Sequence, residues 1–136
     1  MNQWMDEGLR AFAEGEVDWA DSGITIRVYA LSSAYSFSAA HDHVDDLSGI
    51  LDFVALTGRS VGPSGVLDAD DAAFAAVASG QTITQLMVAK WSGTASTSSL
   101  LMYQDTNEDT TPISRTSDGS SIPLIWSATA DRIARL

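Results

Sequence analysis

Apolar residues gather in short runs along this chain, and turn-forming residues separate the runs. Three such runs lie between Thr82 and Trp126, at residues 83–91 (ITQLMVAKW), 99–105 (SLLMYQD) and 122–126 (IPLIW). Each run is bounded by Gly, Ser, Thr, Asn or Asp, which is the pattern of strands in a buried antiparallel sheet. A buried helix competes for any single short apolar run, but the lengths and the polar borders favour strands. We expect the three strands to form a β-meander around which the rest of the chain packs.

The most regular alternation of apolar and polar positions lies in residues 24–31 (ITIRVYAL). Successive side chains of a strand point to opposite faces, so this segment is predicted to be a strand with two distinct faces. One face carries Ile24, Ile26, Val28 and Ala30, and the other carries Thr25, Arg27, Tyr29 and Leu31. A further strand is expected at residues 50–56. Between them, the small-residue loop at residues 32–40 has Tyr35 and Phe37 as its expected anchors.

Turn-forming residues dominate the middle of the chain. The sequence GPSG at residues 62–65 is a strong turn signal, flanked by the pairs Ser60–Val61 and Val66–Leu67. Residues 72–77 (AAFAAV) allow two interpretations, because alanine favours a helix while the brevity of the run favours a strand. A short final strand is expected at Ile133 and Leu136.

An amphipathic helix is predicted for residues 2–14. Four apolar residues recur at spacings of three to five and are expected to share one helical face: Trp4, Met5, Leu9 and Phe12. Gly15 is a stop signal. Gly8 inside the helix costs about 1 kcal/mol relative to alanine, so the helix is expected to depend on docking. Its apolar face either covers one end of the sheet or contacts a partner or a neighbouring subunit.

Together these elements predict a mainly β protein, a single antiparallel β-sandwich or barrel-like domain with an N-terminal amphipathic helix. We expect one domain over residues 1–136, with the helix in residues 1–15 and the β domain in residues 22–136. A chain near 150 residues buries roughly 68–70% of its unfolded surface, so a core forms without covalent cross-links. The chain has no cysteine, which excludes disulfides, thiolate metal sites and a cysteine nucleophile.

The formal net charge is −11, with one lysine and six arginines. Contacts with phosphates need clustered Lys and Arg, so no direct nucleic-acid partner is expected. No segment approaches the roughly 20 apolar residues of a membrane span, so no membrane association is expected. The first residues, MNQWMDEGLRAF, lack the basic and apolar regions of a secretory signal. The acidity itself suits solubility, or a surface exposed near nucleic acid that must not bind it.

Potential metal ligands are densest in the segment HDHVDDLSG, which starts at His41. In a strand, His41 and His43 would share a face and could chelate a divalent ion. The segment does not have the pattern of a strand and lacks the HExxH spacing, so a solvated turn or the start of a short helix is favoured. The acidic residues at 68–71 fail the calcium-loop pattern at its sixth and twelfth positions. No metal site is predicted.

No arrangement of residues points to an enzyme. The chain lacks a GxSxG elbow, and its only lysine, Lys90, does not follow a Gly-rich phosphate loop. Eighteen acidic residues always offer carboxylate pairs for a glycosidase, but nothing selects one pair. We therefore expect a protein that is not an enzyme and needs no cofactor.

Four tryptophans are many for a chain of this size, and they are Trp4, Trp19, Trp91 and Trp126. Large aromatic surfaces are favoured in cores and in subunit interfaces. Exposed tryptophans could equally line a carbohydrate-binding face. We favour the core or interface interpretation over the glycan-binding one.

The order of these segments resembles a family of small structural proteins of tailed bacteriophages, described as capsid decoration or head-fibre proteins. After the N-terminal helix, the resemblance rests on EGEVDWADSGITIRVYAL, HDHVDDLSG, ALTGRSVGPSGVLDADDAAFAAVASG and LLMYQDTNEDTTPIS followed by IPLIW. It covers the chain from the helix to Trp126. None of these motifs is catalytic, and their order and spacing carry the resemblance. The segment after Trp126 departs from the family pattern.

The resemblance implies a virion protein made in the cytoplasm of a bacterial host. It suggests binding to the outer face of the capsid, with the major capsid protein and a homotrimer of the chain itself as partners. The expected contact residues are Trp4, Leu9 and Phe12 on the helix. In the loop of residues 41–47 they are His41, His43 and Leu47. The alternatives are a minor tail or tail-tube-associated protein, a carbohydrate-binding adhesion module and, least favoured, a hydrolase with paired acids.

Overall fold

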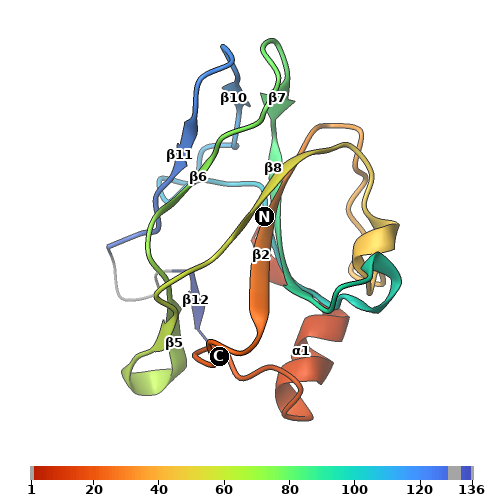
Figure 1. Ribbon diagram of the computed structural model, residues 1–136, viewed down its shortest axis with the longest axis vertical. Helices are drawn as coiled ribbons and strands as arrows, with labels where there is room; N and C mark the ends of the chain where they lie inside the picture. The colour runs from red at the N-terminus through yellow and green to blue at the C-terminus, as the bar shows by residue number, and fades with distance from the viewer. Residues whose placement is uncertain (1, 129–132, 136) are drawn as a thin grey trace.

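The computed structural model describes residues 2–128 and 133–135, and it is mainly β with one helix near the N-terminus (Figure 1). A central antiparallel sheet has five strands in the order β1-β9-β8-β2-β3. These are β1 (Gln3–Trp4), β9 (Leu100–Gln104), β8 (Gln85–Trp91), β2 (Thr25–Leu31) and β3 (Ile50–Ala55). The mainly β prediction is confirmed, although the described strands do not close into a barrel. In the described ranges, no helix has the length and apolar character needed to cross a bilayer.

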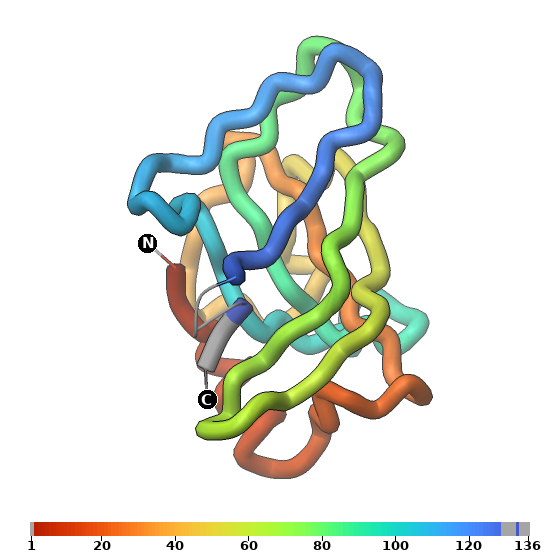
Figure 2. Tube along the Cα trace, turned by 90° about the vertical axis from the view of Figure 1, so that its left-hand side faces the viewer, coloured from red at the N-terminus to blue at the C-terminus, as the bar shows by residue number. Residues whose placement is uncertain are grey.

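Three small antiparallel sheets accompany the central one. They pair β7 (Thr82–Ile83) with β10 (Arg115–Thr116), β6 (Ala72–Phe74) with β11 (Ile122–Leu124), and β5 (Val66–Asp68) with both β4 (Ser60–Val61) and β12 (Ala134–Arg135). Short 3₁₀ turns lie at Val44–Asp46, Pro63–Gly65 and Ala95–Thr97. Figure 2 shows the β6 and β11 segments running side by side, although many residues separate them in the sequence.

Both faces of the central sheet are buried, and strand β2 contributes to each. Ile26, Val28 and Ala30 face the main core, which the small sheets cover with residues such as Leu67 and Phe74. The opposite face carries an outer cluster, in which Tyr29, Leu31, Met87 and Tyr103 pack under Tyr35 and Val44 from the loop between β2 and β3. The predicted alternation of residues 24–31 is therefore confirmed, and so is the anchoring role of Tyr35, which is buried.

The predicted strands are present, but the β-meander is wrong. Strands β8 and β9 are antiparallel neighbours, as expected. Strand β11 instead pairs with β6, because β1 occupies the other edge of β9 through the pairs Gln3–Tyr103 and Trp4–Met102. The ambiguous run at residues 72–77 contains a strand, and the GPSG turn joins β4 to β5 as predicted. Leu136, expected in the last strand, lies outside the described residues.

The N-terminal helix is shorter than predicted. Helix α1 (Asp6–Ala13) starts only after β1, so Trp4 belongs to a strand. The prediction that Met5 and Leu9 share one helical face is also wrong, since Met5 is fully buried before the helix and Leu9 is 49% exposed. The helix docks through Gly8 and Ala11, both buried. A Cβ on Gly8 would lie 2.7 Å from the Cα of Leu101, so only glycine allows this close approach to β9.

Arg59 fastens the turn before β2 to the end of β3. Its guanidinium donates to four backbone carbonyls: Trp19 at 2.8 Å, Leu56 at 3.0 Å, Asp21 at 2.5 Å and Ile24 at 2.9 Å. Burial lowers the pKa of this guanidinium, because removal from water disfavours the charged form. The charge-assisted bonds to the carbonyls offset that loss of hydration.

Candidate functional site

The expected contact residues of the N-terminal segment split between core and surface. The rings of Trp4 and Phe12 meet edge to face with centroids 5.4 Å apart, and both pack partly buried against the main core. Leu9 is the member of this set that projects into solvent. Contact with a partner therefore remains a prediction, and Leu9 is the side chain best placed for it.

The loop that carries His41, His43 and Leu47 is ordered by its own hydrogen bonds. His41 Nδ1 lies 2.8 Å from the hydroxyl of Tyr35, and His43 Nδ1 lies 2.9 Å from a carboxylate oxygen of Asp42. Leu47 packs partly buried on the outer cluster. The predicted turn or short helix is confirmed as the 3₁₀ turn Val44–Asp46. Within the described residues, no three His, Asp or Glu side chains gather closely enough to hold a metal ion.

Asp46 closes the start of this 3₁₀ turn. One of its carboxylate oxygens accepts hydrogen bonds from the backbone N–H of Asp42 at 2.9 Å and of His43 at 3.2 Å. These two backbone donors lower the pKa of the Asp46 carboxyl, because they stabilise its charged form. Asp46 therefore orders the start of this turn.

A buried glutamine ties the same loop to the central sheet. Gln85 donates through Nε2 to the carbonyls of Ser32 at 2.9 Å and Tyr35 at 3.1 Å. Its Oε1 accepts a hydrogen bond from the hydroxyl of Tyr103. Burial raises the pKa of both Tyr35 and Tyr103. Both hydroxyls therefore stay protonated at neutral pH.

A surface that the sequence did not single out lies on the outer face of the sheet, where Arg27 sits between two aromatic rings. The guanidinium carbon is 3.9 Å from the ring centroid of Trp91 and 4.2 Å from that of Phe53. Strand register produces this arrangement, since Thr25 pairs with Trp91 and Tyr29 pairs with Phe53 on either side of Arg27. We call Trp91, Arg27 and Phe53 the stack.

The stack is partly open to solvent. Phe53 is 47% exposed, and Ile50 farther along β3 is 42% exposed. Arg27 approaches the hydroxyl of Tyr29 only at 3.5 Å, and its Nε is buried with no hydrogen-bond partner among the described groups. A guanidinium on an aromatic face gains about 0.5–2 kcal/mol from the ring. The predicted alternation places Arg27 and Tyr29 on one face, but only the pairing of three strands reveals the two rings beside Arg27.

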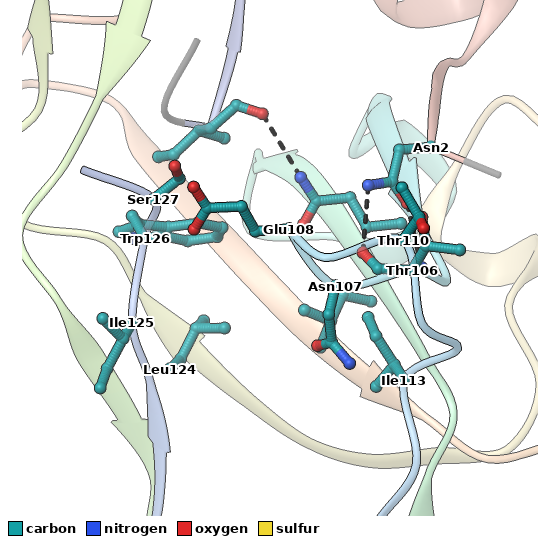
Figure 3. A pocket seen from close by; sticks show the side chains of 13 residues that line it. Asn2, Thr106, Asn107, Glu108, Thr110, Ile113, Leu124, Ile125, Trp126 and Ser127 are labelled. Atoms are coloured by element: carbon teal, nitrogen blue, oxygen red, sulfur yellow. Dashed lines mark hydrogen bonds between the residues drawn. The ribbon is translucent and has the colours of Figure 1, made fainter. Parts of the chain in front are cut away.

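A cleft of about 470 Å³ opens between the loop after β9 and the segment that continues β11 (Figure 3). Its apolar wall includes Ile113, Leu124, Ile125 and Trp126. The polar side carries Asn2, Gln104, Thr106, Asn107, Glu108 and Thr110. In Figure 3 the carboxylate of Glu108 points from the loop toward Trp126 and Ser127. We call this hollow the Trp126 cleft, and its volume is that of a small-ligand site.

Hydrogen bonds hold both sides of the Trp126 cleft in place. On the loop side, Asn2 Oδ1 accepts from the backbone N–H of Asp105 at 3.0 Å and of Thr106 at 3.1 Å. On the opposite side, the backbone N–H of Trp126 donates to the carboxylate of Asp71 at 3.0 Å. The acidic segment before β6 thus positions the backbone of this tryptophan.

The four tryptophans occupy different environments. Trp19 lies in the main core and donates through Nε1 to the carbonyl of Asp68 at 2.9 Å, which confirms the core interpretation for this residue. Trp4 packs partly buried beside Phe12. Trp91 and Trp126 are partly buried as well, and they belong to the stack and to the cleft. Interface or ligand roles for Trp91 and Trp126 stay predictions.

The described cations are largely engaged within the fold. Arg10 contacts the carboxylates of Glu7, Glu14 and Glu16, and its guanidinium lowers the pKa of Glu7 and Glu16. Lys90 donates to the carbonyl of Glu16 at 2.5 Å. Arg27 and Arg59 are held as described above. The described surface is therefore dominated by carboxylates, in line with the net charge of −11.

A scan against models of protein families matches none of them, and a search of curated proteins finds no match for this chain.

Proposed function

We propose that this chain is a non-enzymatic structural protein of a tailed-bacteriophage virion. It binds the outer face of the assembled capsid as a decoration protein and stabilises the shell. The order of the sequence segments supports the family, and the stack of Trp91, Arg27 and Phe53 is the observation that carries a contact function. The major capsid protein and further copies of this chain are its partners.

The stack has the chemistry of a protein contact. Trp and Arg are enriched among residues that dominate interface energies, and such residues work best when their rotamers are already fixed. Arg27 is fixed by two rings, and Phe53 and Ile50 add exposed apolar surface beside it. In this contact, the partner contributes an oxygen atom that accepts hydrogen bonds from the guanidinium of Arg27. It also contributes an apolar side chain that packs against the ring of Phe53.

The charge of the chain indicates which charge the partner carries around the binding site. Carboxylates dominate the exposed surface, because the described cations are largely engaged within the fold. Complementary charge steers association and suppresses wrong partners. The outer surface of the shell therefore presents Lys and Arg around the site where this chain lands. Packaged or released DNA is repelled by the same field.

Assembly as a trimer uses two different surfaces on each copy. A head-to-tail contact closes into a ring when its rotation is a third of a turn. Leu9 on α1 and the stack on the outer face of the sheet provide two separate exposed surfaces. Three copies that each touch the shell bind with avidity, so no single contact has to be large. Such a trimer bridges neighbouring capsid subunits at local threefold positions.

Rebinding to particles that lack this protein tests the proposal. Wild-type protein is expected to bind depleted heads at a stoichiometry set by local symmetry, and labelled protein is expected on heads. Phe53→Ser is expected to weaken binding at least tenfold, which is about 1.4 kcal/mol. Val61→Ser is the matched control, because Val61 is a similarly exposed apolar residue, 50% exposed, on the β4–β5 hairpin.

Two outcomes contradict the proposal. Label confined to tails assigns the chain to the tail instead, as a minor tail or tail-tube-associated protein. Equal weakening by Phe53→Ser and Val61→Ser removes the stack from the contact, since both changes take away exposed apolar surface of similar kind.

A further inference from the structure

The Trp126 cleft continues into a second hollow. This neighbour, of about 400 Å³, shares Leu86, Asn107, Ile113, Leu124 and Ile125 with the cleft and extends toward Phe74, Ile83 and Arg115. The two hollows form one groove between the segment after β9 and β11. An elongated ligand of more than one small unit therefore fits better than a single ion or a single small group.

The two walls of the Trp126 cleft differ in chemistry. One wall is apolar and ends in Ile125, which is 71% exposed, and in the partly buried indole of Trp126. The facing loop offers the carboxylate of Glu108 and the hydroxyl of Thr110 (Figure 3), while Asn107 Nδ2 already donates to the hydroxyl of Thr111 at 3.2 Å and to the carbonyl of Pro112 at 3.4 Å. A ligand with an apolar face and a hydrogen-bonding edge matches both walls at once. A pyranose ring has this form, because its axial C–H groups pack on an aromatic surface while its hydroxyls project sideways.

Some polar groups at the cleft have structural partners and others do not. Asn2 is engaged with Asp105 and Thr106, and Gln104 Nε2 donates to the carbonyl of Ile133 at 3.4 Å. Within the described residues, the carboxylate of Glu108 has no hydrogen-bond partner, and neither does the buried Nε1–H of Trp126. An unpaired buried donor costs about 1–3 kcal/mol. The carboxylate of Glu108 is thus able to accept a hydrogen bond from a ligand hydroxyl.

The charge of the cleft and the sequence of β11 argue against two classes of ligand, acidic sugars and peptides. Glu108 is the only charged side chain among the described residues that line the cleft, so an acidic sugar is disfavoured there. A peptide would be expected to add as a strand along β11, but Pro123 stands in the middle of that strand. Proline lacks the N–H that an edge strand uses to accept a new partner.

We propose that this groove binds a neutral oligosaccharide, with one pyranose ring between Trp126 and Glu108. The apolar wall packs on the C–H face of the ring, and Glu108 accepts hydrogen bonds from ring hydroxyls. This binding goes beyond the structural role proposed above and does not depend on it. In a virion it gives the particle weak attachment to neutral surface glycans, multiplied by the number of copies.

Titration of the ¹⁵N-labelled full chain tests the groove by following the indole N–H resonances. Trp126→Phe assigns the resonance of Trp126. The probes are maltose, cellobiose, lactose and chitobiose, each at about 10 mM, tenfold above a Kd of about 1 mM. At least one of them is expected to shift the Trp126 resonance saturably while that of buried Trp19 stays in place. Glu108→Gln is expected to weaken that binding about tenfold, because it removes a charged acceptor without changing its shape.

Glucuronic acid and N-acetyl-lysine amide are the opposing probes. Both are expected to shift the Trp126 resonance less than the best neutral disaccharide. The proposal is overturned if no neutral disaccharide moves that resonance, if Glu108→Gln binds as wild type does, or if the lysine amide moves it most, which would assign the groove to cationic side chains. No capsid is present in this titration, so its failure leaves rebinding to heads unaffected, and Glu108→Gln is expected to rebind to heads normally.

Discussion

The hydroxyl of Tyr103 donates a hydrogen bond to Oε1 of Gln85 at 2.7 Å, across two neighbouring strands of the central sheet. The amide of the same glutamine holds the carbonyls of Ser32 and Tyr35. One buried side chain thus joins the sheet to the loop that carries His41, His43 and Leu47. The order of that loop depends on a residue far from it in sequence.

Gln85→Leu is expected to destabilise the protein by about 1–3 kcal/mol, because it leaves the buried carbonyl of Tyr35 without its donor. The carbonyl of Ser32 and the hydroxyl of Tyr103 each lose one hydrogen bond as well, and keep the N–H of Tyr35 and the carboxylate of Asp105 as their other partners. Denaturant unfolding measures the loss, and hydrogen exchange is expected to show faster exchange in residues 33–47. Tyr103→Phe is the control, since it removes one hydroxyl and is expected to cost about 1 kcal/mol. Equal losses in the two variants would show that Gln85 does not hold the loop.

Gly8→Ala is expected to destabilise the protein by about 1–3 kcal/mol, because the added Cβ collides with the backbone of Leu101. Helix propensity alone predicts the opposite, a gain of about 1 kcal/mol. Thermal and denaturant unfolding decide between the two. Ala13→Gly, at an exposed position of the same helix, is expected to cost about 1 kcal/mol through propensity alone. A stabilised Gly8→Ala variant would contradict the close contact between α1 and β9.

Acid is expected to loosen the turn at Val44–Asp46. The folded pKa of Asp46 lies below its unfolded value, so its contribution is present above about pH 4 and is lost as pH falls through the folded pKa. Asp46→Asn is expected to remove this pH dependence and to cost about 0.5–1 kcal/mol at neutral pH, since the group is exposed. Hydrogen exchange of the Asp42 and His43 amides, corrected for intrinsic pH effects, measures the change. Protection that stays constant down to pH values of about 2 would exclude this role.

Arg27→Met is expected to weaken rebinding to depleted heads at least tenfold, or about 1.4 kcal/mol, because it removes the fixed guanidinium from the stack. Stability is expected to fall by about 0.5–2 kcal/mol, because the guanidinium loses its contacts with the two rings, so binding is compared under conditions in which both variants are folded. Arg115→Met removes the same charge from an exposed position outside the stack and is the matched control. Similar weakening by both variants would attribute the effect to net charge instead of the stack.

Local patterns in the sequence predict the elements of this fold well. The strands β2, β8 and β9 and the GPSG hairpin follow from alternation, apolar runs and turn residues, each of which acts within a few positions. Pairing between distant segments does not follow from such patterns. Nothing in the sequence of residues 3–4 indicates a strand, yet β1 pairs with the edge of β9. That edge is then closed to β11, which pairs with β6 instead.

The candidate sites depend even more on long-range register. The sequence shows an arginine on a strand face and several aromatic residues, but the stack exists only because three strands align Arg27 with Trp91 and Phe53. The Trp126 cleft likewise needs Asp71, which is far from Trp126 in sequence, to hold its backbone. For Gly8, sequence reasoning points in the wrong direction. Helix propensity predicts that this glycine destabilises α1, while the close contact with Leu101 requires a residue without a Cβ.

In this cysteine-free chain, the hydrogen bonds of Arg59 join two distant segments without depending on redox conditions. Its four bonds to the carbonyls of Trp19, Asp21, Ile24 and Leu56 close the turn before β2 onto the end of β3. A disulfide in this place would form only after release from a reducing cytoplasm. A guanidinium stays protonated throughout the physiological pH range. Under the proposed virion role, the fold is thus closed in the same way during assembly inside the cell and on the particle after lysis.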